Sequence, residues 1–303
     1  MIIAFFFAFG LLIGSFLNVC IARIPEGVSI VTPGSRCPKC GTPIKWYDNV
    51  PVLAWLWLGG KCRACGAGIS AMYPLVELLT GLLFVGCYLE FGITQATVKW
   101  LFFLCLIVIL TVTDLRVRLL PDVVTLPGLV AGLLFSAFVP PRDDVTFLVS
   151  SFSLRHFRVM LTAKELGLID GVLGAAFGSL LLWGAATAYR LVRHREGMGQ
   201  GDVKMMAMAG AFLGAQNTFL TILFGTLLGS LIGSAAIIFL YVRGVGRSLA
   251  ERASRRGLGE VNKLRWAIAS QYHLPLGTFL GIAALIVMFK FSSYFPFQYP
   301  LFR

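Results

Sequence analysis

Charged side chains are scarce in this chain of 303 residues. Asp, Glu, Lys and Arg together make up 13% of it, whereas a globular sequence carries about a quarter. Because 57% of the residues are hydrophobic, a soluble domain of this size has too little polar surface to cover them. The shortage of charge argues against an ordinary soluble domain and indicates a membrane protein. The alternative is a large soluble all-α protein with buried helices.

Three other features are lacking. The first apolar run, 2–22, has no basic residue before it and no small-x-small cleavage site, so we expect a membrane helix and no signal peptide. No basic stripe interleaved with aromatics is present, so we expect no nucleic-acid partner despite the net charge of +12. Basic residues in a membrane protein more often mark cytoplasmic loops and contacts with anionic lipid. His156, His194 and His273 share no ligand-like spacing, and we expect them to be loop residues.

Long apolar runs are what the sequence has instead. A helix needs about 20 apolar residues to cross the hydrocarbon core of a bilayer. The sequence predicts an all-α polytopic membrane protein with about eight transmembrane helices, at 2–22, 72–91, 98–114, 122–140, 169–190, 203–215, 218–242 and 274–292. The sixth is short and rich in Met, Ala and Gly, which indicates a half-helix that does not span alone.

The basic residues fix the expected orientation. Most of the 26 Lys and Arg residues fall in or beside four connections on one side, namely 23–71, 115–121, 191–202 and 243–273. The positive-inside rule makes that side cytoplasmic and places both termini outside. On the other side, the loop 141–168 carries Arg155, Arg158 and Lys164 among apolar residues, and we expect an interfacial amphipathic helix there.

Two C-x-x-C pairs lie in the first cytoplasmic loop, at Cys37, Cys40, Cys62 and Cys65. A glycine follows each pair, as tight knuckle turns prefer. Four thiolates delivered in this way suit tetrahedral structural zinc. A reducing cytoplasm argues against two disulfides, and redox chemistry at one pair is the other interpretation. The remaining three cysteines lie in apolar runs and are expected to be inert packing residues.

Two aspartates are expected at the cytoplasmic edge of the membrane. Asp114 ends the third apolar run. Asp202 follows a glycine-rich stretch and begins the sixth apolar run. Ionisable groups at that depth are costly and usually functional. Two neighbouring carboxylates share one proton, so that one acts as a base on water while the other polarises a peptide carbonyl. The simpler interpretations give these acids structural roles: Asp202 as a helix cap, and Asp114 in an ion pair with Arg116 or Arg118. Asp122 is expected to be a helix N-cap.

Glu77 lies within the second predicted membrane segment, with no basic partner nearby in sequence. One interpretation is a carboxyl kept neutral by hydrogen bonds between helices. The other is a role in binding or in methyl transfer. The sequence leaves both open.

The motifs taken together resemble the type IV prepilin peptidase family. They run in order over most of residues 10–215: Gly14-Ser-Phe-Leu-Asn18-Val with Arg23-Ile-Pro25, the paired cysteines with Asn49-Val-Pro51 and Trp55-Leu between them, Tyr73-Pro-Leu-Val-Glu77-Leu-Leu-Thr, Asp114 with Leu120-Pro-Asp122 and Thr125-Leu-Pro127, and Glu196-Gly-Met-Gly199-Gln-Gly201-Asp202-Val-Lys204. A weaker match to the family pattern follows at Leu274-Pro-Leu-Gly277. Arg116 and the long loop 141–168 depart from the family pattern.

The resemblance implies two reactions. The first is cleavage of the basic leader of type IV prepilins and type II secretion pseudopilins, with Asp114 and Asp202 as the catalytic acids. The second is methylation of the new N-terminal amine with S-adenosylmethionine. The supporting peptidase residues would be Gly199, Gly201 and Lys204, and the methyltransferase candidates Glu77 and Asn18. The implied domains are 1–95, associated with methyl transfer, and 96–303, the peptidase bundle. The implied location is a bacterial inner membrane, where the chain contacts lipid.

Two rival functions belong to other classes. A transporter would use Asp114, Asp202 and Glu77 as a proton or cation path, and an inverted internal repeat, which would favour it, is not visible in the sequence. A non-enzymatic scaffold would recruit a cytoplasmic partner through the cysteine loop. The scaffold hypothesis does not explain the two interfacial acids.

Overall fold

The computed structural model describes residues 1–139, 148–149, 151–153, 161–194, 198–242 and 275–291. Within this part of the chain the regular structure is helical, apart from two isolated β-bridges in the loop between the first two long helices. The elements are α1 (Ile2–Arg23), η1 (Trp46–Asn49), α2 (Leu53–Trp57), α3 (Met72–Phe91), α4 (Gln95–Val117), α5 (Asp122–Phe138), α7 (Ala163–Arg193), α8 (Gln200–Leu213), α9 (Ala215–Val242) and α12 (Leu276–Phe291). The all-helical prediction is confirmed.

Five of these helices, α1, α3, α4, α7 and α9, are long and apolar enough to cross a membrane. The apolar helices α5 and α12 are shorter. Helix α8 has 14 residues and is therefore about 21 Å long, less than the roughly 30 Å of a hydrocarbon core. This agrees with the expectation that the sixth segment does not span by itself. Large apolar side chains on the outer faces, such as Phe5 and Leu12 of α1, are exposed as lipid contacts require.

The fifth predicted segment begins earlier than expected. Helix α7 starts at Ala163 because Thr162 and Glu165 form a capping box, in which each side chain binds the other residue's backbone N–H. Lys164 therefore belongs to the first turn of α7. The other two basic residues of the expected interfacial helix, Arg155 and Arg158, lie outside the described residues.

Glycines let neighbouring helices approach closely. A Cβ at Gly10 would lie 2.8 Å from Gly81 Cα, and one at Gly14 would lie 2.7 Å from Glu77 Cα, so α1 packs against α3 through these positions. Helix α7 packs against α8 in the same way, where Gly174 faces Gly210. Such small-residue faces are typical of membrane bundles.

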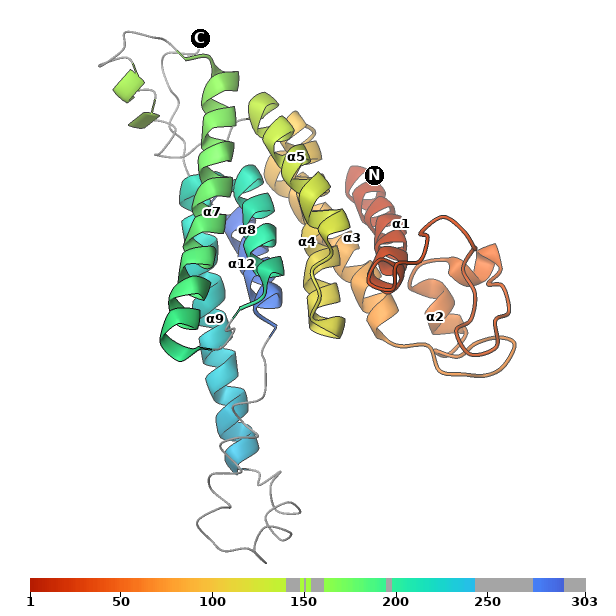
Figure 1. Cartoon of the computed structure of the whole chain (residues 1–303). Helices are drawn as coiled ribbons and strands as arrows, with labels where there is room; N and C mark the ends of the chain where they lie inside the picture. Colours follow the sequence, from red (N-terminus) through yellow and green to blue (C-terminus); the bar gives the residue numbers. More distant parts are fainter. Residues whose placement is uncertain (140–147, 150, 154–160, 195–197, 243–274, 292–303) are drawn as a thin grey trace, which may run out of the picture.

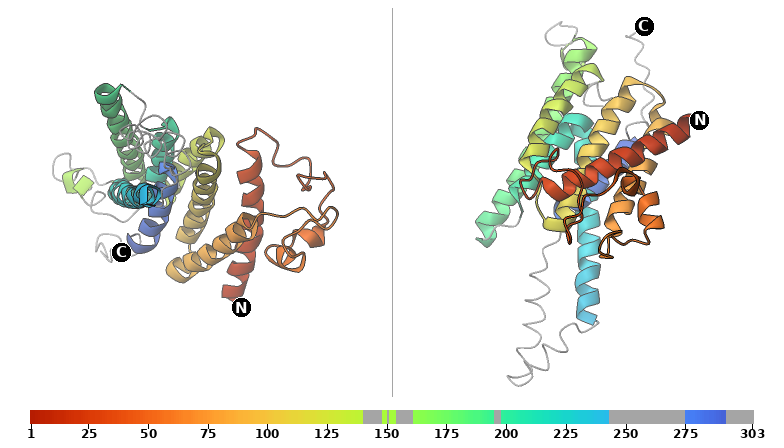
Figure 2. Two further views of the ribbon diagram at one scale, coloured as in Figure 1. Left: turned by 90° about the horizontal axis from the view of Figure 1, so that it is seen from below. Right: turned by 90° about the vertical axis from the view of Figure 1, so that its right-hand side faces the viewer.

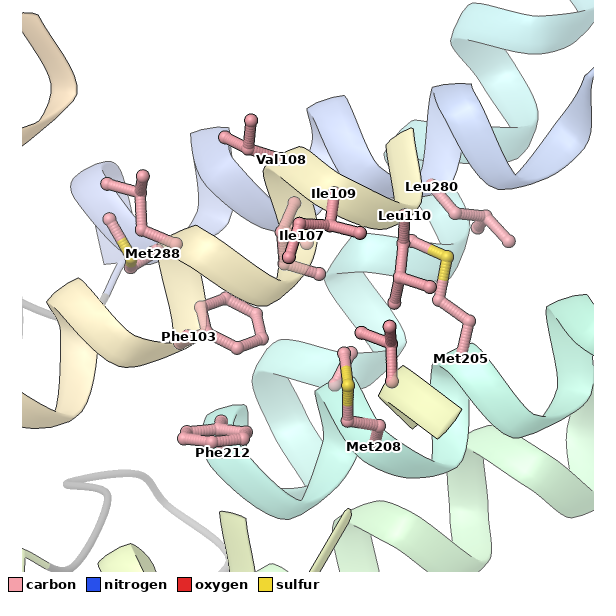
Figure 3. Close-up of a cluster of buried hydrophobic side chains, with 14 of the residues drawn as sticks. Phe103, Ile107, Val108, Ile109, Leu110, Met205, Met208, Phe212, Leu280 and Met288 are labelled. Atoms are coloured by element: carbon pink, nitrogen blue, oxygen red, sulfur yellow. The ribbon is translucent and has the colours of Figure 1, made fainter. Parts of the chain in front are cut away.

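Helix α4 is the centre of the bundle and packs against α1, α3, α5, α8 and α12 (Figures 1 and 2). Figure 3 shows the core that α4, α8 and α12 form together, with Leu110, Met205 and Leu280 converging near one end. All three side chains are fully buried.

Helix ends rich in basic residues gather at one end of the molecule, which we call the basic end. Arg23 ends α1, Arg116 lies in the last turn of α4, Arg190 lies in the last turn of α7, and Lys204 lies near the start of α8. The long loop between α1 and α3 leaves the bundle at this end and lies beside α1 and α3 (Figure 1). The chain is a multi-pass membrane protein with a distinct polar loop attached to it.

Candidate active site

The core of α4, α8 and α12 ends at the basic end in two acids. Asp114 follows Leu110 by one turn of α4, and Asp202 precedes Met205 by one turn of α8, so both acids continue buried helix faces. Their residues are 6% and 9% exposed. The fold therefore brings both carboxylates into the protein interior at one level.

Helix α4 ends at Val117, three residues after Asp114. Arg118 adopts a left-handed conformation, with φ of 55°, and its N–H donates to the carbonyl of Asp114 at 2.8 Å. The sequence left open an ion pair of Asp114 with Arg116 or Arg118. Among the described residues, no ion pair joins Asp114 to either arginine.

Asp202 lies in the first turn of α8, behind the N-cap residue Gly199. A Cβ at Gly201 would lie 2.9 Å from the Cβ of Leu120, so only glycine allows α8 to start this close to the α4–α5 turn. A Cβ at Gly199 would meet Asp202 Oδ2 at 3.7 Å, which is ordinary contact. The two glycines of the motif thus differ, because only Gly201 is required sterically. The third glycine of the stretch before Asp202, Gly197, lies outside the described residues.

Both acids lie against the start of α12. A Cβ at Gly277 would lie 3.0 Å from both Asp114 Oδ2 and Asp202 Oδ1, so these two oxygens are no further apart than twice that distance. Glycine at this position keeps a side chain away from both oxygens. A water molecule shared by two carboxyl groups is the arrangement that aspartyl proteolysis requires.

Thr278, the residue after Gly277, holds one of the acids in place. Its backbone N–H and its hydroxyl donate to Asp114 Oδ2 at 2.7 and 2.9 Å, and the hydroxyl also lies 3.3 Å from the carbonyl of Thr111. Sequence reasoning missed this contact. The available signal was the weak match to the family pattern at Leu274-Pro-Leu-Gly277, at the start of the last apolar run. It did not point to Thr278.

The expectation that Asp122 is a helix N-cap is wrong. Pro121 takes the N-cap position of α5, and Asp122 is the first helical residue with no capping bond. Its carboxylate pairs with Lys204 of α8 at 2.7 Å. Both side chains are largely exposed, at 53% and 37%. Lys204, expected to support the peptidase motif, thus ties α8 to α5.

The four loop cysteines meet as predicted. The Sγ atoms of Cys37, Cys40, Cys62 and Cys65 all lie within 4.8 Å of one another, and no disulfide joins them. Zinc–sulfur bonds of about 2.3 Å in a tetrahedron place sulfurs about 3.8 Å apart, and the Cys37–Cys65 separation is 3.9 Å. The donor set and its spacing therefore fit one structural zinc ion.

Each cysteine pair forms a knuckle. Gly41 and Gly66 have φ of 70° and 69°, and their N–H groups donate to the carbonyls of Cys37 and Cys62 at 2.9 Å. Positive φ suits glycine, which explains its place after each pair. Hydrogen bonds with the hydroxyl and the backbone of Thr42 lower the pKa of the Cys40 thiol to about 6. The hydrogen bond from the backbone of Ala67 lowers the pKa of the Cys65 thiol, but contacts with the other three thiols outweigh it and raise that pKa to about 11.

The other cysteines are packing residues, as expected. Cys20 and Cys87 are buried and Cys105 is half-buried, and all three belong to or pack against the hydrophobic core. They lie on α1, α3 and α4, away from the cysteine loop.

The two remaining candidates, Glu77 and Asn18, lie where α1 and α3 cross. Glu77 Oε2 accepts the N–H of Val52 from the cysteine loop at 2.8 Å, and Asn18 Nδ2 donates to the carbonyl of Tyr73 at 2.9 Å. Both residues are buried. They are on α1 and α3, whereas the aspartate pair is on α4 and α8.

Comparison with known proteins matches both parts of the chain. Residues 8–91 match the bacterial peptidase A24 N-terminal domain, and residues 100–234 match the type IV leader peptidase family. No solved structure gives a significant match.

Curated relatives cover most of the chain. A prepilin leader peptidase/N-methyltransferase of Myxococcus xanthus is 38% identical over 90% of this chain and 73% of its own length. The protein of the same name from Aeromonas hydrophila is 38% identical over 77% of this chain and 80% of its own length. That of Pseudomonas aeruginosa is 35% identical over 77% and 79%. The chain belongs to the type IV leader peptidase family.

Proposed function

We propose that this protein cleaves the leader from type IV prepilins and related pseudopilins and then methylates the new N-terminus. The observation that carries the peptidase is the pair Asp114 and Asp202, each of which has a carboxylate oxygen next to Gly277. Relatives named for the same two activities support the assignment.

The proposed cleavage is a direct attack of water. One carboxylate removes a proton from water while the hydroxide adds to the scissile carbonyl carbon, and the other carboxyl group donates its proton to the carbonyl oxygen. The tetrahedral intermediate then collapses, the C–N bond breaks, and the amine nitrogen takes up a proton. The products are a leader with a free carboxylate and a mature pilin with a free amine. Because Thr278 donates two hydrogen bonds to Asp114 Oδ2, we assign the ionised carboxylate to Asp114 and the shared proton to Asp202.

The position of the pair suits such a substrate. A prepilin has a basic leader before an apolar helix, so its scissile bond lies where the membrane meets the cytoplasm. The aspartates lie at the basic end, which the positive-inside rule places in the cytoplasm of a bacterial inner membrane. We therefore propose that the substrate helix lies in the membrane beside α12, with its leader at the basic end.

The second activity is assigned to the N-terminal region. We propose that 1–95, with the cysteine loop, Glu77 and Asn18, transfers a methyl group from S-adenosylmethionine to the new amine, and that 96–303 forms the peptidase. In this transfer the amine nitrogen bonds the methyl carbon, the carbon–sulfur bond breaks, and the nitrogen loses a proton. Zinc, held by the four cysteines, would join the two knuckles and shape the loop.

The test is an incubation of the purified protein with a prepilin and S-adenosylmethionine, followed by mass spectrometry. We expect a shortened pilin that carries one added methyl group. Cleavage without methylation would leave the peptidase standing and remove the transferase. An uncut prepilin would refute the proposed peptidase and leave the transporter and the scaffold as the functions to test.

A further inference from the structure

The backbone of Val52 has an unusual conformation. Its φ and ψ are 62° and −52°, and the N–H of Leu53 donates to the carbonyl of Pro51 at 2.6 Å. A hydrogen bond from residue i+2 to residue i across a central residue of positive φ is the strained form of the γ-turn. For a β-branched residue such a φ is a genuine outlier. Strain of this kind persists only where the surroundings impose it.

Glu77 supplies the contact that imposes it. The N–H of Val52 donates to Glu77 Oε2 at 2.8 Å, and Glu77 itself is 8% exposed. The position of Glu77 is fixed in turn, because Gly14 of α1 lies directly against its Cα. The side chains of Ser15 and Asn18 lie beside the same carboxylate. Glu77 thus sits where α1, α3 and the loop meet.

The turn also determines where the next part of the loop lies. Helix α2 begins at Leu53, directly after it. Trp55 of α2 donates its indole N–H to the carbonyl of Ile69 at 3.1 Å, and the N–H of Ile69 donates to the carbonyl of Gly60 at 2.7 Å. Gly60 and Ile69 flank the second cysteine knuckle, which starts at Cys62. Hydrogen bonds and the short helix α2 therefore link the buried carboxylate to the two residues that flank the second cysteine knuckle.

We propose that Glu77 is a positioning residue that fixes the cysteine loop on the membrane bundle through the Val52 turn, and that it does not itself bind the substrate amine. The inference deepens the proposed methyltransferase and rests on it, since the loop is what that activity would use. What matters at position 77 is then a hydrogen-bond acceptor for Val52, and the negative charge is dispensable. A residue that binds the amine's positive charge would have the opposite requirement.

Glu77→Gln and Glu77→Leu separate the two roles. Glutamine keeps a carbonyl oxygen for the Val52 N–H, whereas leucine has a similar size and no acceptor. Two readouts are needed: methylation of a pre-cut pilin, and amide hydrogen exchange over residues 50–58, which reports the turn itself. Prepilin cleavage serves as the folding control, since the aspartates lie on other helices.

If Glu77 positions the loop, Glu77→Gln keeps methylation within about threefold and exchange close to that of the parent protein. Glu77→Leu loses at least about tenfold in methylation and exchanges at least about tenfold faster over 50–58. Adding Val52→Gly to Glu77→Leu restores part of the methylation, because glycine adopts the turn without help.

Two results would overturn the proposal. One is equal loss of methylation in both single variants with exchange over 50–58 unchanged, which would make the charge the functional feature. The other is an unchanged exchange rate in Glu77→Leu. Because exchange is measured without any substrate, the positioning role is tested even if the parent protein proves to have no methyltransferase activity.

Discussion

Helices α4 and α1 are alike in length and hydropathy and differ in surroundings. They have 23 and 22 residues and similar hydropathy, yet 61% of the apolar stretch of α4 is buried within the protein and only 22% of that of α1. Helix α4 is enclosed by five other helices, and α1 packs mainly on α3. The candidate peptidase site is thus positioned by helix packing. The loop attached to α1 and α3 is positioned by turns, four cysteines and a few polar contacts.

Substitution of the aspartates should give the largest difference between the two regions. Asp114→Asn or Asp202→Asn keeps size and most hydrogen bonding but removes an acid–base group. We expect prepilin cleavage to fall by about 10² to 10⁴, the usual contribution of general acid–base catalysis. Methylation of a pre-cut pilin should remain, since it depends on the other region. Loss of both activities together in a well-folded variant would contradict the separation into two centres.

The glycine that lies against both acids gives the next largest effect. Gly277→Ala would put a methyl group 3.0 Å from both carboxylates, where it would compete with the water that we propose they share. We expect cleavage to drop roughly tenfold to a hundredfold, as small displacements at a catalytic centre do. The matched control is Gly184→Ala on the exposed side of α7, where the added Cβ meets nothing within 4 Å. Equal rates in these two alanine variants would show that the position beside Gly277 is not used.

The role of the cysteine loop is tested by removing its metal. Purified protein should contain about one zinc per chain, and Cys37→Ser should lose it. We expect methylation to fall by about tenfold or more, and cleavage to change by only a few-fold. Cys105→Ala, a half-buried cysteine outside the cluster, should keep the zinc. Metal-free parent protein that methylates normally would refute a structural role for zinc.

The smallest effect is expected at Asp122. Asp122→Asn removes an exposed ion pair with Lys204, and such pairs contribute about 0.5 kcal/mol, so we expect cleavage to change by a factor of about two. The assay is the same prepilin cleavage. If Asp122→Asn abolished cleavage while Asp114→Asn did not, Asp122 would be the first catalytic acid.

Much of the fold was accessible from sequence because lipid requires long apolar helices, and these are visible as runs. The boundaries were less accessible where local hydrogen bonds decide them. Helix α7 begins at Ala163, six residues before the predicted 169. The prediction missed these residues because Lys164 and Glu165 interrupt the apolar run. The capping box from Thr162 to Glu165 was the signal that marks the true start.

The candidate site was predictable to the extent that its residues carry local patterns. The paired C-x-x-C spacing predicted the four-cysteine cluster, which the structure confirms. The contact between Thr278 and Asp114 joins residues 164 positions apart, and the pair of Lys204 with Asp122 joins residues 82 positions apart. Nothing in either local sequence encodes such a partner. The strained turn at Val52 was equally hidden, since a β-branched residue predicts extended backbone.

The central claim is that Asp114 and Asp202 act together on one peptide bond. The most direct measurement is a double-mutant cycle of prepilin cleavage with Asp114→Asn, Asp202→Asn and the variant that carries both. Groups that act as one unit are strongly non-additive, so we expect each single change to reach nearly the same low rate and the double change to lower it little further. Single variants that keep the parental rate, or two losses that multiply in the double variant, would contradict a catalytic pair.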